Sequence, residues 1–256
     1  MIDAMRFGGI ERLYGDGVLQ RLASMHVAVV GLGGVGSWAV EALARSGVGQ
    51  LTLIDLDDVC VTNVNRQVHA LEGTIGLPKT TVLAKRINLI NPACRVQVEE
   101  TFFTANNAEQ LLSQGFDYVV DAIDSMQDKC VLVSECQKRQ MPLVVSGGVG
   151  GKRDPASVKV AELRDATNDP LLKRLRRRLR QDFGYSRDLK QPLGCQAVYS
   201  TENPMFPWSD GRVCVEPEAN TSLTLDCASG FGTAGFLTGT FGFAAASVVV
   251  QSLLGS

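Results

Sequence analysis

Residues 26–47 carry the feature that most constrains the fold, a short apolar strand followed by a glycine-rich turn and a helical pattern. In the turn GLGGVG, Gly31, Gly33 and Gly36 stand at G-x-G-x-x-G spacing. The first glycine permits a tight turn, the second lets a phosphate approach the backbone, and the third lets helix and strand pack closely. Phosphates would then face free N–H groups at the positive end of the helix. The pattern predicts a nucleotide site at the first strand of a parallel sheet.

The first half of the chain repeats this alternation of β-branched runs and helical patterns, which is typical of a doubly wound, mostly parallel α/β sheet. We expect strands at 26–33, 50–57, 95–100, 118–124 and 142–151, and helices at 34–47, 76–92, 106–115 and 125–140. The remainder is less regular, with expected strands at 157–164 and 196–201. These patterns predict an N-terminal arm (1–24), a nucleotide-binding core (25–151) and a C-terminal extension (152–256) of the same structural unit.

The composition excludes some classes of protein. The formal net charge is -2, from 25 basic and 27 acidic residues, so no global field favours nucleic acid or membrane. The seven cysteines form no C-x-x-C pair, which argues against a disulfide framework and against a structural zinc site. The first residues lack the apolar core of a secretory signal. We therefore expect a cytoplasmic protein.

Asp55 closes the second expected strand, where a carboxylate can accept hydrogen bonds from both ribose hydroxyls. The glycine turn and Asp55 fit NAD and ATP equally well. A hydride-transfer enzyme would also need a nicotinamide pocket and usually a proton-transfer group. The chain has only two histidines, and His26 is expected to begin the first strand, which leaves His69.

Three charged residues favour a triphosphate over a dinucleotide. Arg66 and Lys79 can neutralise charge on phosphates, and Asp124, at the mouth of the strand YVVDAID, can hold magnesium. All three follow the carboxyl ends of expected strands, where open α/β sheets bind their ligands. Each alone would more often be a solvated surface charge, but together on one rim they predict a site for ATP and Mg²⁺.

The segments GLGGVGSWAVEALARSGVGQLTLIDLDDVCVTNVNRQ, GLPK and DAIDS resemble the adenylating domain of ubiquitin-activating enzymes and of the molybdopterin- and thiamine-pathway adenylyltransferases. The resemblance covers residues 25 to about 150. It implies a Rossmann-like adenylating core. It also implies an enzyme that activates a carboxylate by making its acyl-adenylate from ATP.

On this chain, the resemblance implies a defined set of site residues. The nucleotide would be held by Gly31, Gly33, Gly34, Gly36, Asp55, Asp57, Asn63, Arg66, Gln67, Lys79 and Asp124. Magnesium would bind Asp124, and Arg66, Lys79 and Asp124 would act in catalysis. In this family, an arginine of the N-terminal arm reaches the partner subunit's ATP site, which implies a homodimer. Arg12 is the candidate for that arginine, although the spacing around RFGG differs from the usual pattern and a surface arginine is the alternative.

Four further segments, RFGGIERLYG, DPLLKRLRRRLRQDFG, YSTENP and DCASGFGTAGFLTGTFGF, are similar to the tRNA threonylcarbamoyladenosine dehydratases, so that this resemblance covers almost the entire chain. It implies ATP-dependent cyclisation of N6-threonylcarbamoyladenosine next to the tRNA anticodon. The threonyl carboxylate would be adenylated, and the carbamoyl group of the substrate would close the ring without an enzyme cysteine. The resemblance also suggests a cysteine desulfurase and sulfur-acceptor system as a partner.

Three other functions stay open at this stage. The nearest is an adenylyltransferase for the C-terminus of a small ubiquitin-like sulfur-carrier protein, which would use the same ATP machinery. The missing C-x-x-C pairs and the basic run count against it. An NAD-dependent oxidoreductase would leave Arg66, Lys79 and Asp124 without a role, and a binding module or scaffold would need no magnesium carboxylate.

A basic run lies on the helix expected at about 169–183. Its cations are Lys173, Arg174, Arg176, Arg177, Arg178 and Arg180. Leu172, Leu175 and Leu179 give the helix one apolar stripe for docking onto the core. A solvated cationic face is the ordinary interpretation of such a run. Because the implied substrate is a polyanion, we expect these six cations to contact tRNA.

The C-terminal segment from Cys227 onward carries no charged residue. Cys227 precedes a Gly/Ser turn, a setting that can lower a thiol pKa, but the expected chemistry does not require a cysteine there. The segment is long enough to span a bilayer. Thr238, Thr240, Ser247 and Gln251 interrupt its apolar run, so we expect a helix buried in the core or at a dimer interface, without stable membrane insertion.

Overall fold

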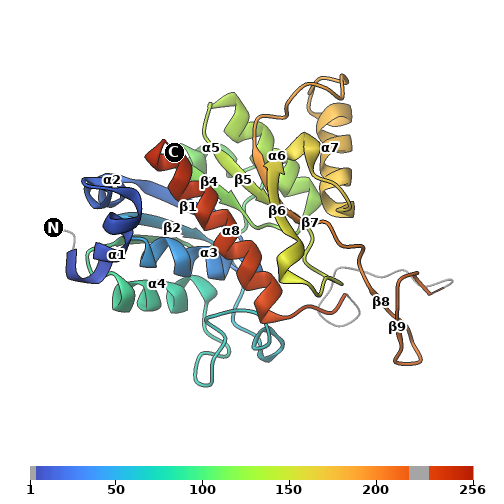
Figure 1. Ribbon diagram of the computed structural model, residues 1–256, viewed down its shortest axis with the longest axis horizontal. Helices are drawn as coiled ribbons and strands as arrows, with labels where there is room; N and C mark the ends of the chain where they lie inside the picture. Colours follow the sequence, from blue (N-terminus) through green and yellow to red (C-terminus); the bar gives the residue numbers. More distant parts are fainter. Residues whose placement is uncertain (1–3, 219–230, 256) are drawn as a thin grey trace.

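The structure is a computed structural model that describes residues 4–218 and 231–255. A seven-stranded sheet lies at its centre, with helices on both faces (Figure 1). The strands are β1 (His26–Val30), β2 (Gln50–Ile54), β3 (Arg95–Glu99), β4 (Tyr118–Asp121), β5 (Leu143–Ser146), β6 (Val158–Glu162) and β7 (Gln196–Ser200). Their order is β3-β2-β1-β4-β5-β7-β6, and neighbours are parallel except for β6 and β7. The predicted doubly wound, mostly parallel sheet is confirmed.

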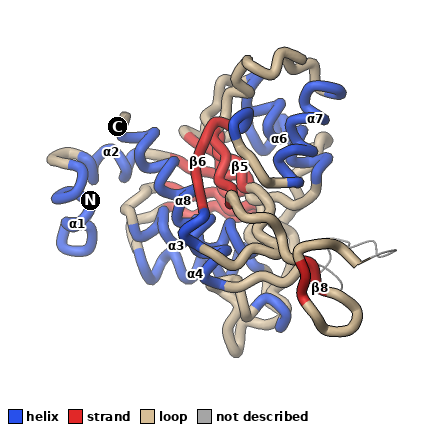
Figure 2. Tube along the Cα trace, turned by 45° about the vertical axis from the view of Figure 1, so that its right-hand side comes forward, coloured by secondary structure: helices blue, strands red, loops and turns tan. Residues whose placement is uncertain are grey.

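Helices alternate with these strands along the chain. They are α1 (Ala4–Tyr14), α2 (Val18–Ser24), α3 (Gly34–Arg45), α4 (Lys79–Ile90), α5 (Ala108–Leu112), α6 (Met126–Lys138), α7 (Pro170–Asp182) and α8 (Gly235–Leu254). Single 3-10 turns occupy Val61–Asn63, Pro155–Ser157 and Leu163–Asp165. A small hairpin of β8 (Phe206–Pro207) and β9 (Val213–Cys214) projects from the body (Figure 2).

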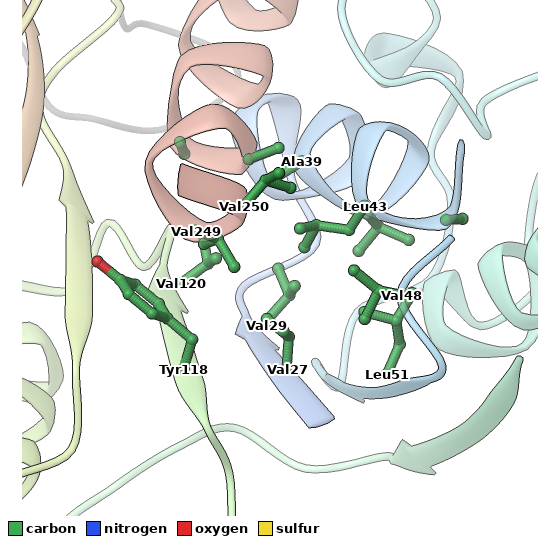
Figure 3. Packing of buried hydrophobic residues seen from close by; sticks show 14 of the residues in the cluster. Val27, Val29, Ala39, Leu43, Val48, Leu51, Tyr118, Val120, Val249 and Val250 are labelled. Atoms are coloured by element: carbon green, nitrogen blue, oxygen red, sulfur yellow. The ribbon is translucent and has the colours of Figure 1, made fainter. Parts of the chain in front are cut away.

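The sheet separates two hydrophobic cores because successive side chains of a strand point to opposite faces. On β1, Val27 and Val29 belong to the core under α3 and α8, and Ala28 and Val30 to the core under α5, α6 and α7. Figure 3 shows the first core, where Val249 of α8 lies with the strand residues. A buried branched side chain contributes about 1.5–3 kcal/mol relative to its exposed state, so both cores stabilise the central strands.

The C-terminal extension continues this sheet. β7 pairs in parallel with β5, and β6 pairs antiparallel with β7 at the edge, so the strands expected at 157–164 and 196–201 are both present. The extension also supplies α8, which packs along α3. A Cβ on Gly242 would lie only 2.6 Å from Trp38 Cβ, so this glycine permits the close approach of the two helices.

By length and composition α8 is long and apolar enough to cross a membrane. Half of its most apolar stretch is buried inside the structure. Its buried residues include Leu237, Phe241, Ala245 and Val249, which recur at helical spacing and contact the first core. The interruptions at Thr240 and Ser247 lie away from that face. One face of the helix is therefore a core element of the protein.

The chain order of the strands reverses at β1, which has β2 on one side and β4 on the other. Loops after β1 and β4 consequently leave the sheet in opposite directions and open a crevice at the carboxyl ends of these strands. Gly31 and Ala122 are the first residues after the two strands, and Ala122 N donates to Val30 O at 2.9 Å. The predicted nucleotide turn thus lies at the switch point of the sheet.

Candidate active site

A cavity of about 1170 Å³ opens at the carboxyl ends of the central strands. Ten of the predicted nucleotide-site residues line it: Gly31, Gly33, Gly34, Asp55, Asp57, Asn63, Arg66, Gln67, Lys79 and Asp124. These residues come from four separate segments of the sequence. The eleventh, Gly36, does not line the cavity, and its place in the turn gives the reason.

The glycines of the turn differ in what surrounds them. Gly31 has a φ of 86°, and a Cβ there would lie 2.7 Å from Ala122 O, so both the left-handed conformation and the neighbouring strand require glycine. A Cβ on Gly36 would lie 1.8 Å from Gly31 O, so Gly36 serves the packing of α3 against the turn. A Cβ on Gly33 would meet nothing within 4 Å, and this residue faces open space at the start of α3. The close approach of a ligand is therefore possible at Gly33.

Asp55 is buried at the end of β2, and its carboxylate already organises the site. Its Oδ2 accepts from Leu32 N at 2.5 Å, within the glycine turn, and its Oδ1 accepts from Asp57 N at 2.9 Å. An ionised carboxylate has about four lone-pair sites, so these two bonds leave acceptor capacity for a ligand hydroxyl. Asp55 therefore joins the glycine turn to the loop after β2.

Lys79 is the first residue of α4, and it is buried and lines the cavity. Its Nζ donates to Asp57 Oδ2 at 2.7 Å, and its backbone N donates to Asp57 O at 3.0 Å. The Asp57 side chain is 52% exposed, so this ion pair is partly screened by solvent. Lys79 is thereby held on the same wall as the glycine turn, where an anionic ligand would compete with Asp57 for its charge.

Arg66 lies on the loop between β2 and α4 and is held through both its backbone and its side chain. Its carbonyl oxygen accepts from Trp38 Nε1 at 3.0 Å and from Thr238 Oγ1 at 2.9 Å, which ties the loop to α3 and α8. Its guanidinium donates to Thr62 O at 2.7 Å through Nη1 and lines the cavity. The apolar C-terminal helix thus helps to position a cation of the candidate site, a link that the sequence did not indicate.

The other two predicted residues of this loop, Asn63 and Gln67, are buried. Asn63 Oδ1 accepts from Cys60 N at 2.9 Å and closes the short turn that precedes Arg66. Gln67 lines the cavity, and its Oε1 has no hydrogen-bond partner within residues 4–218 and 231–255. A buried amide oxygen without a partner is costly and is the kind of group that a ligand or water satisfies.

Asp124 follows β4 on the opposite side of the crevice, where it is exposed and lines the cavity. It forms no hydrogen bond or ion pair with the part of the chain that the structure describes. Across those residues, no group of three or more His, Cys, Asp or Glu side chains could enclose a metal ion. Magnesium at a phosphate site commonly uses one or two carboxylates, phosphate oxygens and water, so Asp124, which lines the same cavity as the glycine turn, fits Mg²⁺.

The basic helix is present as α7, and its predicted apolar stripe is confirmed, because Leu172, Leu175 and Leu179 are fully buried. Among its six cations, Arg174 lines the cavity. Four others are tied to neighbouring segments or to their own helix: Arg176 donates to Leu163 O, Arg177 to Gln181, Arg178 to Gln127 and Asp182, and Arg180 to Ser186 O. Lys173 and Arg177 are exposed away from the cavity.

Two predicted residues lie elsewhere. Arg12 is exposed on α1 and does not line the cavity, so within one chain the structure does not bring it to the site. Cys227 lies outside the described residues.

Sequence reasoning missed the loop 146–150 and Phe206, which line the cavity from the side of β5. The glycine-rich run SGGVGG at the end of a buried strand was the available signal.

The model of the ThiF family matches residues 9–256, and the chain belongs to that family. It is 50% identical over 250 residues to the tRNA threonylcarbamoyladenosine dehydratase of Escherichia coli (strain K12), covering 97% of this chain and 93% of the relative. The dehydratase of Haemophilus influenzae is 46% identical over the same shares. The solved structure of the E. coli enzyme in complex with ATP covers 100% of this chain and 97% of that one, at 45% identity and a TM-score of 0.88.

Proposed function

We propose that this protein is an enzyme that dehydrates N6-threonylcarbamoyladenosine in tRNA, next to the anticodon, in an ATP-dependent cyclisation. The single observation that carries the proposal is the cavity at the switch point, which is lined by a glycine turn, by the two cations Arg66 and Lys79, and by Asp124. This arrangement occurs in a chain that matches tRNA threonylcarbamoyladenosine dehydratases over nearly its whole length.

The first step is adenylation of the threonyl carboxylate. A carboxylate oxygen bonds to the α-phosphorus of ATP, the bond from that phosphorus to the bridging oxygen breaks, and pyrophosphate leaves. Charge that develops on the phosphate oxygens is balanced by Arg66, Lys79 and the N–H groups at the start of α3. Asp124 would hold Mg²⁺, which supplies further charge neutralisation. Gly33 gives the phosphates access to the backbone.

The second step is ring closure within the substrate. The carbamoyl group attacks the activated carbonyl carbon, AMP leaves with the original carboxylate oxygen, and the carbamoyl group loses one proton. The substrate thus loses the elements of one water, and ATP becomes AMP and pyrophosphate. Because the reacting groups are a few bonds apart, proximity favours closure and no enzyme nucleophile is needed.

The proposal includes partners beyond ATP. The tRNA would meet the protein along α7, where Lys173 and Arg177 are exposed. A homodimer would let Arg12 of one protomer approach the cavity of its partner, and a cysteine desulfurase with its sulfur acceptor is a further candidate partner. We expect the enzyme in the cytoplasm, with α8 in the protein core rather than in a membrane. Complete extraction by low-salt buffer without detergent would support this location.

The proposal is tested by comparing tRNA nucleosides from a strain with this protein and from one lacking it. Mass spectrometry should find the threonylcarbamoyl nucleoside heavier by one water in the deletion strain, and the lighter form should return with the wild-type gene. A gene carrying Asp124→Ala should fail to restore it. Identical nucleosides in both strains would contradict the proposed reaction.

A further inference from the structure

The cavity has two walls of different character. Residues 30–128 form what we name the nucleotide wall, which holds the glycine turn and the phosphate-site candidates. The loop 146–150, the first turns of α7, Phe206 and Phe231 form the acceptor wall. Pockets for a single small molecule commonly occupy about 300–1,000 Å³, so a cavity of 1170 Å³ is larger than a single small ligand usually requires.

Charge is distributed unequally between the walls. Among the residues that the structure describes, every carboxylate that lines the cavity belongs to the nucleotide wall: Asp55, Asp57, Asp58, Asp124 and Asp128. The nucleotide wall also contributes Arg66 and Lys79. Within the described residues, the acceptor wall contributes one charged side chain to the cavity, that of Arg174. An anion on that side of the cavity would therefore meet a cation, with no carboxylate on the same wall in the described part of the chain.

The helix that carries Arg174 is firmly anchored next to the cavity. Asp169 is buried at the N-cap of α7, where its Oδ1 accepts from Leu172 N at 2.9 Å and its Oδ2 accepts from Gly148 N at 2.9 Å. This carboxylate joins the start of the helix to the cavity loop after β5. Leu172 and Leu175, on either side of Arg174, are fully buried. Pro170 and Leu171, one turn before Arg174, line the same cavity.

Arg174 also differs from its neighbours on α7 in its contacts. Arg176 Nη1 donates to Leu163 O at 3.1 Å, and Arg178 Nη2 donates to Gln127 Oε1 at 2.7 Å. Both guanidinium groups therefore brace the helix against adjacent segments. Arg174 has no hydrogen bond or ion pair to any described residue, although it borders the cavity. A guanidinium has five donors, and those of Arg174 are not used by the described residues, so they are available to a ligand.

We propose that Arg174 binds an anionic group of the acceptor substrate within the cavity, so that its role is separate from that of the outward cations of α7. The inference rests on the proposed function. A guanidinium pairs in a fork with two oxygens of a carboxylate or a phosphodiester. The acceptor nucleoside has both, in its threonyl carboxylate and in the flanking phosphates.

The aromatic residues of the acceptor wall suit the rest of such a substrate. Phe206 and Phe231 line the cavity with their ring centroids 5.2 Å apart. A Cβ on Gly150 would lie 2.7 Å from Phe231 Cβ, so the glycine loop after β5 makes room for this ring. Nucleobases stack on aromatic side chains when they are taken out of a nucleic-acid strand. An apolar aromatic surface with one cation matches a base that carries an anionic side chain.

The test compares Arg174→Gln with Arg153→Gln as the matched control. Arg153 is an exposed cation outside α7 that does not line the cavity and is not among the cations expected to contact tRNA. Binding is measured for tRNA with and without the threonylcarbamoyl group, and for ATP. Arg174→Gln should bind the modified tRNA about 10- to 100-fold more weakly than wild type, as expected for the loss of a charged hydrogen bond. Its ATP affinity should be unchanged, and Arg174→Lys should be intermediate.

The two anion sources give different results. If Arg174 binds the carboxylate, Arg174→Gln loses the preference of the wild-type protein for modified over unmodified tRNA. If it binds a phosphodiester, the affinities for both tRNAs fall by the same factor. Equal tRNA binding by Arg174→Gln and Arg153→Gln, or a fall in ATP affinity as large as that in tRNA affinity, would overturn the inference. Product formation by the wild-type enzyme is measured separately, so a failure of the proposed function is distinguishable.

Discussion

Lys129 and Asp121 form an ion pair with no solvent exposure on either side chain. Asp121 lies three residues before Asp124, the candidate magnesium ligand. Lys129 Nζ lies 2.8 Å from Asp121 Oδ1, and the same oxygen accepts from Ile123 N at 3.0 Å. Asp121 is the last residue of β4, and Ala122, Ile123 and Asp124 line the cavity. The pair therefore shapes the turn that presents Asp124.

This buried pair predicts an asymmetry between single and double substitutions. Lys129→Met should lower the free energy of unfolding by about 3–5 kcal/mol, because it leaves a buried carboxylate without its partner. Adding Asp121→Asn should restore most of that loss, since two neutral side chains need no charge compensation. Urea unfolding of the three proteins measures this coupling. Additive losses in the double variant would show that the two side chains do not depend on each other.

The glycine turn predicts opposite outcomes for two alanine substitutions. Gly36→Ala places a methyl group where Gly31 O now lies, so we expect a stability loss of about 3 kcal/mol. Gly33→Ala should leave the protein folded, because the added Cβ meets no protein atom within 4 Å. It should nevertheless bind ATP at least about tenfold more weakly, since the methyl group occupies the approach of the phosphates. Thermal unfolding and calorimetric ATP titration separate the two effects; wild-type ATP affinity in Gly33→Ala would remove the turn from the site.

The phosphate-site candidates predict a loss of adenylation chemistry without a loss of fold. Asp124→Ala and Arg66→Ala should each lower ATP–pyrophosphate exchange dependent on the modified tRNA by about 10²–10³-fold, as expected when one preorganised charge is removed from a transition state. Both side chains lie outside the two cores, so thermal unfolding should change little. Arg153→Ala is a suitable control because Arg153 is an exposed cation that does not line the cavity. Near wild-type exchange in either variant would exclude that residue from the reaction.

His69 predicts how the stability depends on pH. Its side chain is fully buried, and burial, with Lys79 and Arg86 nearby, lowers its pKa from 6.5 to about 4. Between these values the unfolded chain binds more protons than the folded protein. The contribution of His69 to the free energy of unfolding is therefore fully present above about pH 6.5 and is lost as the pH drops toward 4. The loss from this group between about pH 8 and pH 5 should be roughly 2 kcal/mol.

Urea unfolding of wild type and His69→Leu at these two pH values measures the contribution. The variant should lose less stability on acidification than the wild type. His26, whose pKa burial also lowers, remains in both proteins and contributes equally to their residual dependence. The same loss in both proteins would show that His69 is not the responsible group.

The sequence was sufficient for features that depend on local spacing. The glycine turn, the alternation of strands and helices, and the leucine stripe of α7 follow from a few neighbouring residues. Asn107 marks the limit of such reasoning. Asn107 is the N-cap residue of α5, and asparagine at this position often accepts a hydrogen bond from the helix, but its Oδ1 accepts from Thr104 N and makes no cap bond.

Features that depend on how distant segments are arranged could not be predicted from the sequence. Nothing in the residues of β7 shows that it inserts beside β5, or that β6 then returns antiparallel at the edge. The six cations of α7 look alike in the sequence, and only the packing of the helix beside the loop 146–150 brings Arg174 into the cavity. Similarly, the contact of Thr238 with the Arg66 carbonyl joins segments far apart in the chain.

The central claim is that one cavity adenylates a carboxylate of modified tRNA and releases a cyclised product. The most direct measurement incubates the purified protein with ATP, Mg²⁺ and tRNA that carries threonylcarbamoyladenosine, and then quantifies nucleosides and nucleotides together. The account predicts that the modified nucleoside loses one water while AMP and pyrophosphate form in equal amounts. An unchanged nucleoside, or ADP and phosphate in place of AMP and pyrophosphate, would contradict it.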